Sequence, residues 1–142
     1  MRIWQNQLQV NLISIESYPM PTFNTIVESF GDPSPSYYST IDAVHGYLQV
    51  SVTEQSSKLL GLESDLKTYV FRRVPFGLSC SPYWYQKLMN KLLHGYMYIF
   101  CASYIDDILA WSRDWSTHLH HLRLIFARIL HHIVRPFPLR VD

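Results

Sequence analysis

The sequence has few cysteines and no long apolar run, and both shortages exclude classes of protein. The two cysteines among 142 residues, Cys80 and Cys101, form no CxxC pair and no disulfide framework, which favours reduced thiols inside a cell. No apolar run reaches the roughly 18 residues that a membrane span needs. Residues 1–7 are too polar for the apolar part of a signal peptide. We therefore expect a cytoplasmic or nuclear protein without a membrane partner.

Charge is also scarce. Charged residues make up 16% of the chain, and the formal net charge is +1. A protein that binds nucleic acid on its own is usually more basic, so any such binding must depend on local residues. Apolar residues make up 48% of the chain, which together with the low share of charge excludes a disordered chain and supplies the core of one domain. Aromatic residues make up 15%, which suits either a dense core or a stacking surface for bases.

Hydrophobic spacing predicts helices in three parts of the chain. Apolar residues recur at helical intervals over 22–30, 82–93 and 115–133. Ser81 is suited to cap the second of these helices, because its hydroxyl can accept from a free backbone N–H of the first turn. Pro82 would then take the first helical position, where no N–H partner is needed. Asp114 or Ser116 can cap the third.

Runs rich in β-branched and aromatic residues predict short strands between the helices. These runs are 37–41, 47–52, 58–62, 68–74, 97–105 and 108–111. A polar turn around Ser64-Asp65 joins the third and fourth runs. After residue 134, Pro136 and Pro138 interrupt the chain, and we expect no regular structure there.

Two adjacent carboxylates, Asp106 and Asp107, lie between the last two predicted strands, at the tip of a predicted hairpin. Carboxylates at a tight turn are typical ligands of Mg²⁺, and two such ions can stabilise the attacking and leaving oxygens of phosphoryl transfer. Asp42, at the end of the 37–41 run, is the candidate third ligand. Taken alone, an Asp-Asp pair is more often an ordinary turn, in which the side chains bond to nearby backbone.

Histidines cluster in the last predicted helix. His118 and His121 are three residues apart, a spacing that can bind Zn²⁺ on a helix. No cysteine or acidic residue has the spacing of a zinc site around them. We therefore expect packed or solvated histidines.

Three segments together resemble the reverse transcriptases of gypsy-class LTR retrotransposons, in the order and at the spacing of that family. They are STIDAVHGYLQV at 39–50, RVPFGLSCSP at 73–82 and YIDDIL at 104–109. Upstream, NLIS at 11–14 and SYPMP at 17–21 are similar to the segment that precedes these motifs. Downstream, HLHHL at 118–122 is similar to the start of a palm helix. The resemblance covers roughly residues 2–133, and the ordered combination is specific.

This resemblance implies an α+β fold, namely the palm of a right-hand polymerase with a small antiparallel sheet backed by helices and an incomplete set of fingers. It implies one reverse transcriptase domain over 1–135 and an unstructured tail over 136–142. Within that domain, the fingers would be about 1–37 and 51–75, and the palm about 38–50 and 76–135.

The resemblance also implies roles for individual residues. Asp42, Asp106 and Asp107 would bind two Mg²⁺ ions, with Mn²⁺ as a substitute. Tyr47 would be the steric gate that excludes a ribose 2′-OH; its alternative is an ordinary buried strand aromatic. The remaining nucleotide-site residues would be His45 and Gly46 through backbone N–H groups, Phe76 and Gly77 as pocket lining, and Arg2. A solvated surface charge is the alternative for Arg2.

The implied function is RNA-directed DNA polymerase, with two-metal transfer of dNTPs to a primer 3′-OH. Its partners would be an RNA or DNA template with primer, and the thumb, RNase H and integrase of a retroelement polyprotein. Asn6 and Leu8 replace the family's Asp and Arg, and no lysine follows Lys91. These departures, and the missing thumb, indicate a fragment that is weakly active or inactive alone. The alternative is a catalytically dead remnant that at most binds nucleic acid or a partner.

Overall fold

The computed structural model describes residues 18–43, 45–63, 67–132 and 139–141. Arg2, the expected turn at Ser64-Asp65 and the upstream motif at 11–14 lie outside these ranges. The chain divides into two compact units, one of residues 1–17 and 45–84 and the other of residues 18–44 and 85–142. We call them the loop unit and the sheet unit.

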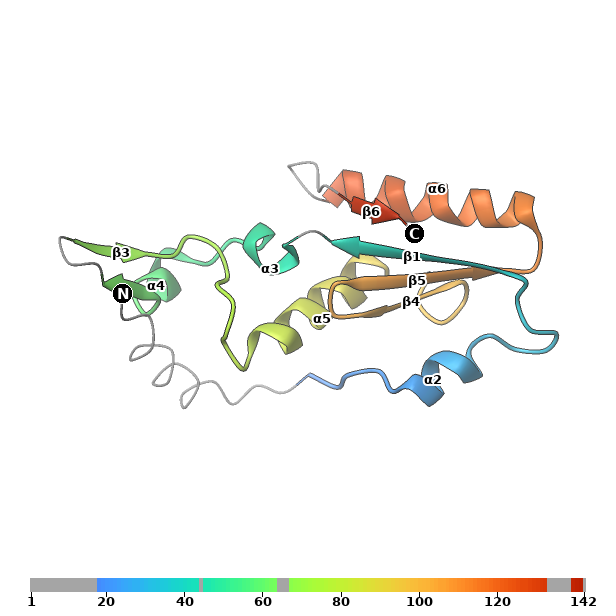
Figure 1. The fold of residues 1–142 in the computed structure, drawn as a ribbon, viewed down its shortest axis with the longest axis horizontal. Coiled ribbons are helices and arrows are strands. Elements are labelled where there is room, and N and C mark those ends of the chain that lie inside the picture. The colour runs from blue at the N-terminus through green and yellow to red at the C-terminus, as the bar shows by residue number, and fades with distance from the viewer. Residues whose placement is uncertain (1–17, 44, 64–66, 133–138, 142) are drawn as a thin grey trace. The chain divides into compact units, whose positions relative to one another are not determined.

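The sheet unit is built on four antiparallel strands in the order β4-β5-β1-β6 (Figure 1). Their bounds are β1 Tyr37–Ala43, β4 Cys101–Tyr104, β5 Asp107–Ser112 and β6 Leu139–Val141. β1 pairs with β5 from Tyr37↔Ser112 to Asp42↔Asp107, and β4 pairs with β5 as a hairpin. The expected small antiparallel sheet is therefore confirmed.

Two helices lie against one face of this sheet, α5 (Ser81–Leu92) and α6 (Trp115–His132). His118 of α6 contacts Ser39 of β1, and Gln86 of α5 contacts Ser103 of β4. Side chains alternate between faces along a strand, so the register puts Ser39 and Ser103 on the same face. The helices therefore share one face, and the even-numbered positions of β1, which include Asp42, belong to the other.

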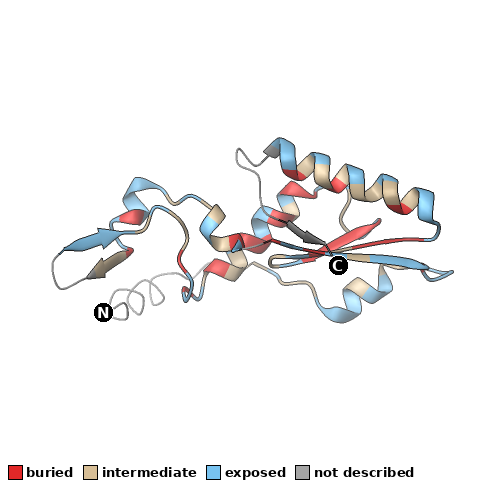
Figure 2. Cartoon of the chain, turned by 45° about the horizontal axis from the view of Figure 1, so that its top comes forward, coloured by how far each residue is buried: buried red, intermediate tan, exposed pale blue. Residues whose placement is uncertain are grey.

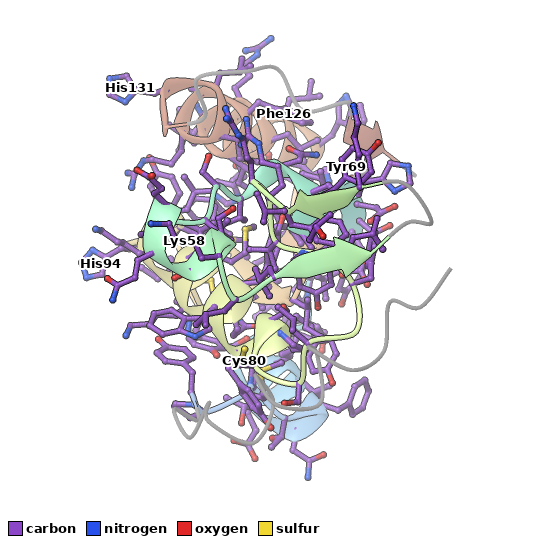
Figure 3. The ribbon with its side chains drawn as sticks, turned by 90° about the vertical axis from the view of Figure 1, so that its left-hand side faces the viewer. Lys58, Tyr69, Cys80, His94, Phe126 and His131 are labelled. Carbon is purple, nitrogen blue, oxygen red and sulfur yellow. The ribbon has the colours of Figure 1, made fainter. Side chains whose placement is uncertain are left out.

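The core of the sheet unit lies between this face and the two helices. Ile41, Cys101, Ile108 and Ile125 are at most 2% exposed. The predicted α6 begins as expected, because the Asp114 carboxylate accepts a hydrogen bond from the N–H of Thr117 (2.9 Å). Along α6, Phe126 is half-buried, whereas the exposed His131 projects away from the ribbon in Figure 3.

The opposite face of the sheet is partly covered by the segment that precedes β1. Helix α2 (Phe23–Glu28) confirms the first predicted helix, and Thr22 caps it by accepting from the N–H of Thr25 (3.2 Å). Just beyond it, the Phe30 ring meets Tyr38 and Trp111 edge-on, at centroid distances of 5.5 and 5.0 Å. Residues 18–44 group with residues 85–142 in the sheet unit, and this contact is one of those that join them.

The described loop unit consists of short elements: α3 Gly46–Gln49, α4 Glu54–Ser57, β2 Gly61–Glu63 and β3 Thr68–Val70. β2 and β3 pair antiparallel, as the sequence predicts, but each is only three residues long. Figure 2 shows β3 exposed, whereas most residues of β4 and β5 in the sheet unit are buried. The first four residues of α5 also belong to this unit.

Several local predictions were wrong. The strand predicted over 47–52 begins as helix α3, because His45 adopts a left-handed φ of 53° and turns the chain after β1. Only its end is extended: the N–H of Val52 donates to Arg72 O (3.2 Å), and the N–H of Val74 donates to Val50 O (3.0 Å). Helix α4 was missed, although Thr53 caps it by accepting from the N–H of Ser56 (3.2 Å).

Three other predictions need correction. The strand predicted over 97–105 is limited to β4, because Tyr98 takes a left-handed φ of 62° and residues 98–100 form turns. The tail predicted to be unstructured contains β6, whose backbone pairs with β1 through Asp42↔Arg140. The Ser81 hydroxyl does not cap α5; it is buried and has no hydrogen-bond partner among the described residues.

Candidate active site

The sheet places Asp42 and Asp107 directly opposite each other on neighbouring antiparallel strands. The N–H of Ala43 donates to Asp106 O (3.2 Å), so Asp42 and Asp107 form a non-hydrogen-bonded pair. In such a pair the side chains come closer than in a hydrogen-bonded pair, with Cβ atoms about 4.5–5.5 Å apart. Both side chains are exposed, on the sheet face that α5 and α6 leave free.

Asp106 joins this pair through the β4–β5 turn, which consists of Ile105 and Asp106. Ile105 has a left-handed φ of 57°. That conformation is uncommon for a residue without glycine's freedom and is rarest for β-branched residues, so the surrounding structure must hold it. The tight turn brings Asp106 to the sheet end where Asp42 and Asp107 face each other.

The three carboxylates influence one another electrostatically. Burial raises the pKa of Asp107, and the negative charges of Asp106 and then Asp42 raise it further. Their oxygen donors suit a hard divalent cation. Among the described residues, however, no three His, Cys, Asp or Glu side chains converge into a metal-binding group. The donor chemistry thus fits a divalent cation, while the side chains would have to rotate to share one.

Gln86 is a residue of this site that the sequence analysis missed. Its side chain is completely buried, and its Oε1 accepts a hydrogen bond from the N–H of Ile105 (2.7 Å). Its Nε2 donates to Ser103 O (3.0 Å) and Ser103 Oγ (3.1 Å). The α5 helix thereby holds the hairpin at the residue before Asp106. A polar residue within the apolar face of the 82–93 helix was the available signal.

The loop unit brings together three of the expected nucleotide-site residues. The Phe76 ring is met edge-on by Tyr47, at 5.7 Å between centroids and an interplanar angle of 87°. His45 approaches the same ring at 6.5 Å and 74°. Tyr47 lies on α3 rather than on a strand, and it is half-buried, so the alternative of a buried strand aromatic is wrong.

Two glycines flank this aromatic group. Gly46 is buried and begins α3, and Gly77 follows Phe76 with a φ of 90°. Because this φ lies in the left-handed region, a side chain at position 77 would be strained. Glycine therefore suits the backbone at both positions.

Arg73 fixes the end of the helix that carries Tyr47. Its Nη1 donates to Gln49 O (2.7 Å) and to Ser51 Oγ (2.9 Å). Gln49 is the last residue of α3, and a cation on a helix's final carbonyls is favourable because it satisfies an acceptor without an intrahelical partner.

The helical histidines pack as expected. His118 is 1% exposed and contacts Ser39 Oγ through Nε2 (2.9 Å) and Ser112 Oγ through Nδ1 (3.0 Å). His121 also contacts Ser112 Oγ (2.8 Å) and stacks on Phe100, with ring centroids 4.0 Å apart. The two histidines contact hydroxyl groups and an aromatic ring, and these contacts form a structural network.

The family comparison confirms the family that the motifs indicate. Residues 1–134 match the model of the family described as reverse transcriptase (RNA-dependent DNA polymerase). The chain is 31% identical over 122 residues to the Retrovirus-related Pol polyprotein from transposon opus of Drosophila melanogaster, covering 85% of this chain and 12% of that protein. The polyprotein from transposon 297 of the same organism is 30% identical, with 85% and 11% covered. The chain thus spans about an eighth of the length of these relatives.

Solved structures show the same fold. The prototype foamy virus protease-reverse transcriptase aligns with a TM-score of 0.73 and 21% identity, over 89% of this chain and 17% of that one. The foamy viral protease-reverse transcriptase in complex with an RNA/DNA hybrid aligns with a TM-score of 0.70 and 24% identity, over 81% and 15%. No helix among the described residues is long and apolar enough to cross a membrane. With most of its length matched by the family model, the chain belongs to the reverse transcriptase (RNA-dependent DNA polymerase) family.

Proposed function

We propose that this chain contributes the carboxylate cluster and part of the nucleotide site to an RNA-directed DNA polymerase. The observation that carries the proposal is the register that pairs Asp42 with Asp107 while Asp106 occupies the adjoining turn. Because the chain spans about an eighth of its polyprotein relatives, other parts of the polymerase would hold the primer and template.

Members of this family generally use divalent metal ions. We propose that Asp42, Asp106 and Asp107 hold Mg²⁺, or Mn²⁺ in its place. Bound there, the cation would supply charge stabilisation for the oxygens that attack and leave during nucleotidyl transfer. The carboxylates provide the oxygen donors. Their mutual repulsion, which adds to the effect of burial in raising the pKa of Asp107, would fall once a cation neutralised them.

In the same proposal residues 1–37 and 51–75 belong to the fingers, and residues 38–50 and 76–135 belong to the palm. Tyr47 would discriminate against a ribose 2′-OH, with Phe76 supporting its ring through the edge-on contact. His45 and Gly46 would offer backbone N–H groups to the triphosphate, and Gly77 would leave room beside the nucleotide. Arg2 would contact the triphosphate. The template, primer and dNTPs are the proposed partners.

The test uses a complete reverse transcriptase that contains this chain. Asp106→Asn should abolish primer extension while leaving the fold intact, because the amide is nearly isosteric but uncharged. Asp114→Asn is the matched control: it makes the same chemical change at the α6 cap, where Asn also caps well, and should retain extension. Near-normal extension by Asp106→Asn would show that the hairpin carboxylates are not the metal site.

Tyr47→Ala tests the second role in the same enzyme. It should keep DNA synthesis and admit ribonucleotides, because it removes a steric block without touching the carboxylates. Unchanged sugar selection would exclude Tyr47 as the gate. The purified 142-residue chain should extend primers weakly or not at all, since a small misplacement of the 3′-OH can cost about 10²-fold in rate.

A second candidate function is a catalytically inactive remnant that only binds nucleic acid or a partner. The observation that favours it is that the described side chains do not converge into a metal-binding group. Mn²⁺ titration of the 142-residue chain, followed by paramagnetic broadening of backbone amide signals, separates the two. Selective broadening around Asp106 that Asp106→Asn removes supports the polymerase, and its absence up to millimolar Mn²⁺ supports the remnant.

A further inference from the structure

A line of hydrogen bonds connects the β4–β5 turn with Tyr18, near the start of the sheet unit. Gln86 Oε1 accepts from the N–H of Ile105 (2.7 Å), and Gln86 Nε2 donates to Asn90 Oδ1 (2.9 Å). Asn90 Nδ2 in turn donates to the Tyr18 hydroxyl oxygen (3.0 Å). All of these residues belong to the sheet unit.

The chemistry of the groups permits one orientation of each amide in this line. The N–H of Ile105 can only donate, so Gln86 must present its oxygen there and its NH₂ group to Ser103 O and Asn90. Asn90 must then present its oxygen to Gln86 and its NH₂ group to the Tyr18 hydroxyl. Each member therefore fixes the orientation of the next.

This line of hydrogen bonds ends at Ile105, where the backbone conformation of the hairpin is unfavourable. Ile105 holds a left-handed φ of 57°, which is unfavourable for a β-branched residue, and Asp106 follows it directly. Gln86 is completely buried, so breaking one of its bonds would leave a polar group without water as a replacement. A substitution of Asn90 or Tyr18 would therefore disturb the hydrogen bonds of Gln86, including the one to the N–H of Ile105 in the turn.

We propose that Asn90 and Tyr18 are positioning residues, which act through Gln86 to hold the Ile105 turn and thereby the direction of Asp106. In the described part of the chain their side-chain hydrogen bonds are to Gln86 and to each other. The consequence for metal binding rests on the proposed function of the carboxylates, whereas the consequence for the turn follows from the hydrogen bonds alone.

The experiment measures amide hydrogen exchange by NMR on the ¹⁵N-labelled 142-residue chain. Tyr18→Phe removes only the hydroxyl, and Asn90→Leu removes both bonds of Asn90. We expect exchange at the N–H groups of Ile105 and Asp106 to rise about fivefold in Tyr18→Phe, as for loss of one ordinary hydrogen bond, and further in Asn90→Leu.

Two control variants separate positioning from general destabilisation. Tyr38→Phe removes the same hydroxyl from a half-exposed tyrosine on β1 and should leave the turn unchanged. Asn90→Asp keeps an oxygen that accepts from Gln86 and can accept from the Tyr18 hydroxyl, so it should restore most of the protection that Asn90→Leu loses.

Faster exchange confined to the turn, with rescue by Asn90→Asp, supports the proposal. Unchanged exchange at the turn in both Tyr18→Phe and Asn90→Leu overturns it. A uniform rise over β1, β4 and β5 also overturns it, because that result means a purely structural role.

A Mn²⁺ titration of the same samples distinguishes this proposal from the proposed function. If both hold, Tyr18→Phe and Asn90→Leu should weaken Mn²⁺ binding about twofold to fivefold, and Asn90→Asp should restore it. If the unsubstituted chain binds no Mn²⁺, the metal site fails, while the exchange result still decides the role of Tyr18 and Asn90.

Discussion

The two units of this chain are stabilised in different ways. The sheet unit has four paired strands and a core between sheet and helices, in which Ile41, Cys101 and Ile125 are fully buried. The described part of the loop unit has two three-residue strands and short helices, and its cohesion includes side-chain bonds to backbone, such as Ser57 Oγ to Phe71 O (2.6 Å) and Arg73 to Gln49 O.

This difference matches the tasks proposed for the two units. Carboxylates that share a cation must be held to a small tolerance, and a continuous strand register provides it. A nucleotide pocket that must close around its substrate is better built from segments with lower local stability, because these can move without disrupting a core. Three predictions test the comparison, in order of decreasing expected effect.

The largest effect should come from removing a core side chain in each unit. Ile125→Ala creates a cavity at a fully buried site and should destabilise the sheet unit by about 2–5 kcal/mol. Leu60→Ala, at 7% exposure in the loop unit, should fall near the lower end of that range. Urea titration followed by amide exchange would report each unit separately. A joint loss of protection in both units would mean that they unfold together and would contradict the comparison.

A smaller, local effect should follow from Arg73→Ala. The substitution removes the donor to Gln49 O and Ser51 Oγ, and the loss should be about 1.5–3 kcal/mol, as for a hydrogen bond from a charged donor. Exchange should rise over residues 46–52 and stay unchanged in β1 and β5. Arg72→Ala is the matched control, because Arg72 is exposed beside it. Equal effects of the two substitutions would exclude the specific role of Arg73.

The smallest effect is a pH dependence of the sheet unit. Burial, and then the nearby His121, lowers the pKa of His118, so the folded state binds a proton less readily than the unfolded state. Stability should therefore fall as the pH drops below about 6.5, the ordinary pKa of histidine. His121, whose pKa burial also lowers, adds to this slope, and His120 and Asp114 are the other titratable groups beside it.

Urea midpoints between pH 7 and pH 5 would measure this slope. His118→Gln should reduce it, whereas His131→Gln should not, because His131 is exposed at the far end of the same helix (Figure 3). An unchanged slope in His118→Gln would mean that the buried histidine does not control the acid sensitivity of α6.

The sequence predicted three of the helices correctly, because a regular spacing of apolar residues dominates in each of them. The three predicted helices are present, with α6 starting at the predicted Trp115 and capped by Asp114. The strand predictions failed where the backbone conformation of single residues overrode the strand propensity of the segments around them. The left-handed residues His45 and Tyr98 redirect apolar runs that read as strands, and β6 forms by pairing with β1 despite a sequence with little strand signal of its own.

The sequence by itself determined the kinds of residue that this protein uses and their order: the paired carboxylates, the aromatic at position 47 and the three motifs that identify the family. These are local properties, which the spacing of residues along the chain reveals. Only the tertiary structure decided that Asp42 faces Asp107, that Gln86 holds Ile105 and that Arg73 closes α3. These contacts join segments far apart in sequence, and strand register and buried hydrogen bonds exist only once the chain is packed.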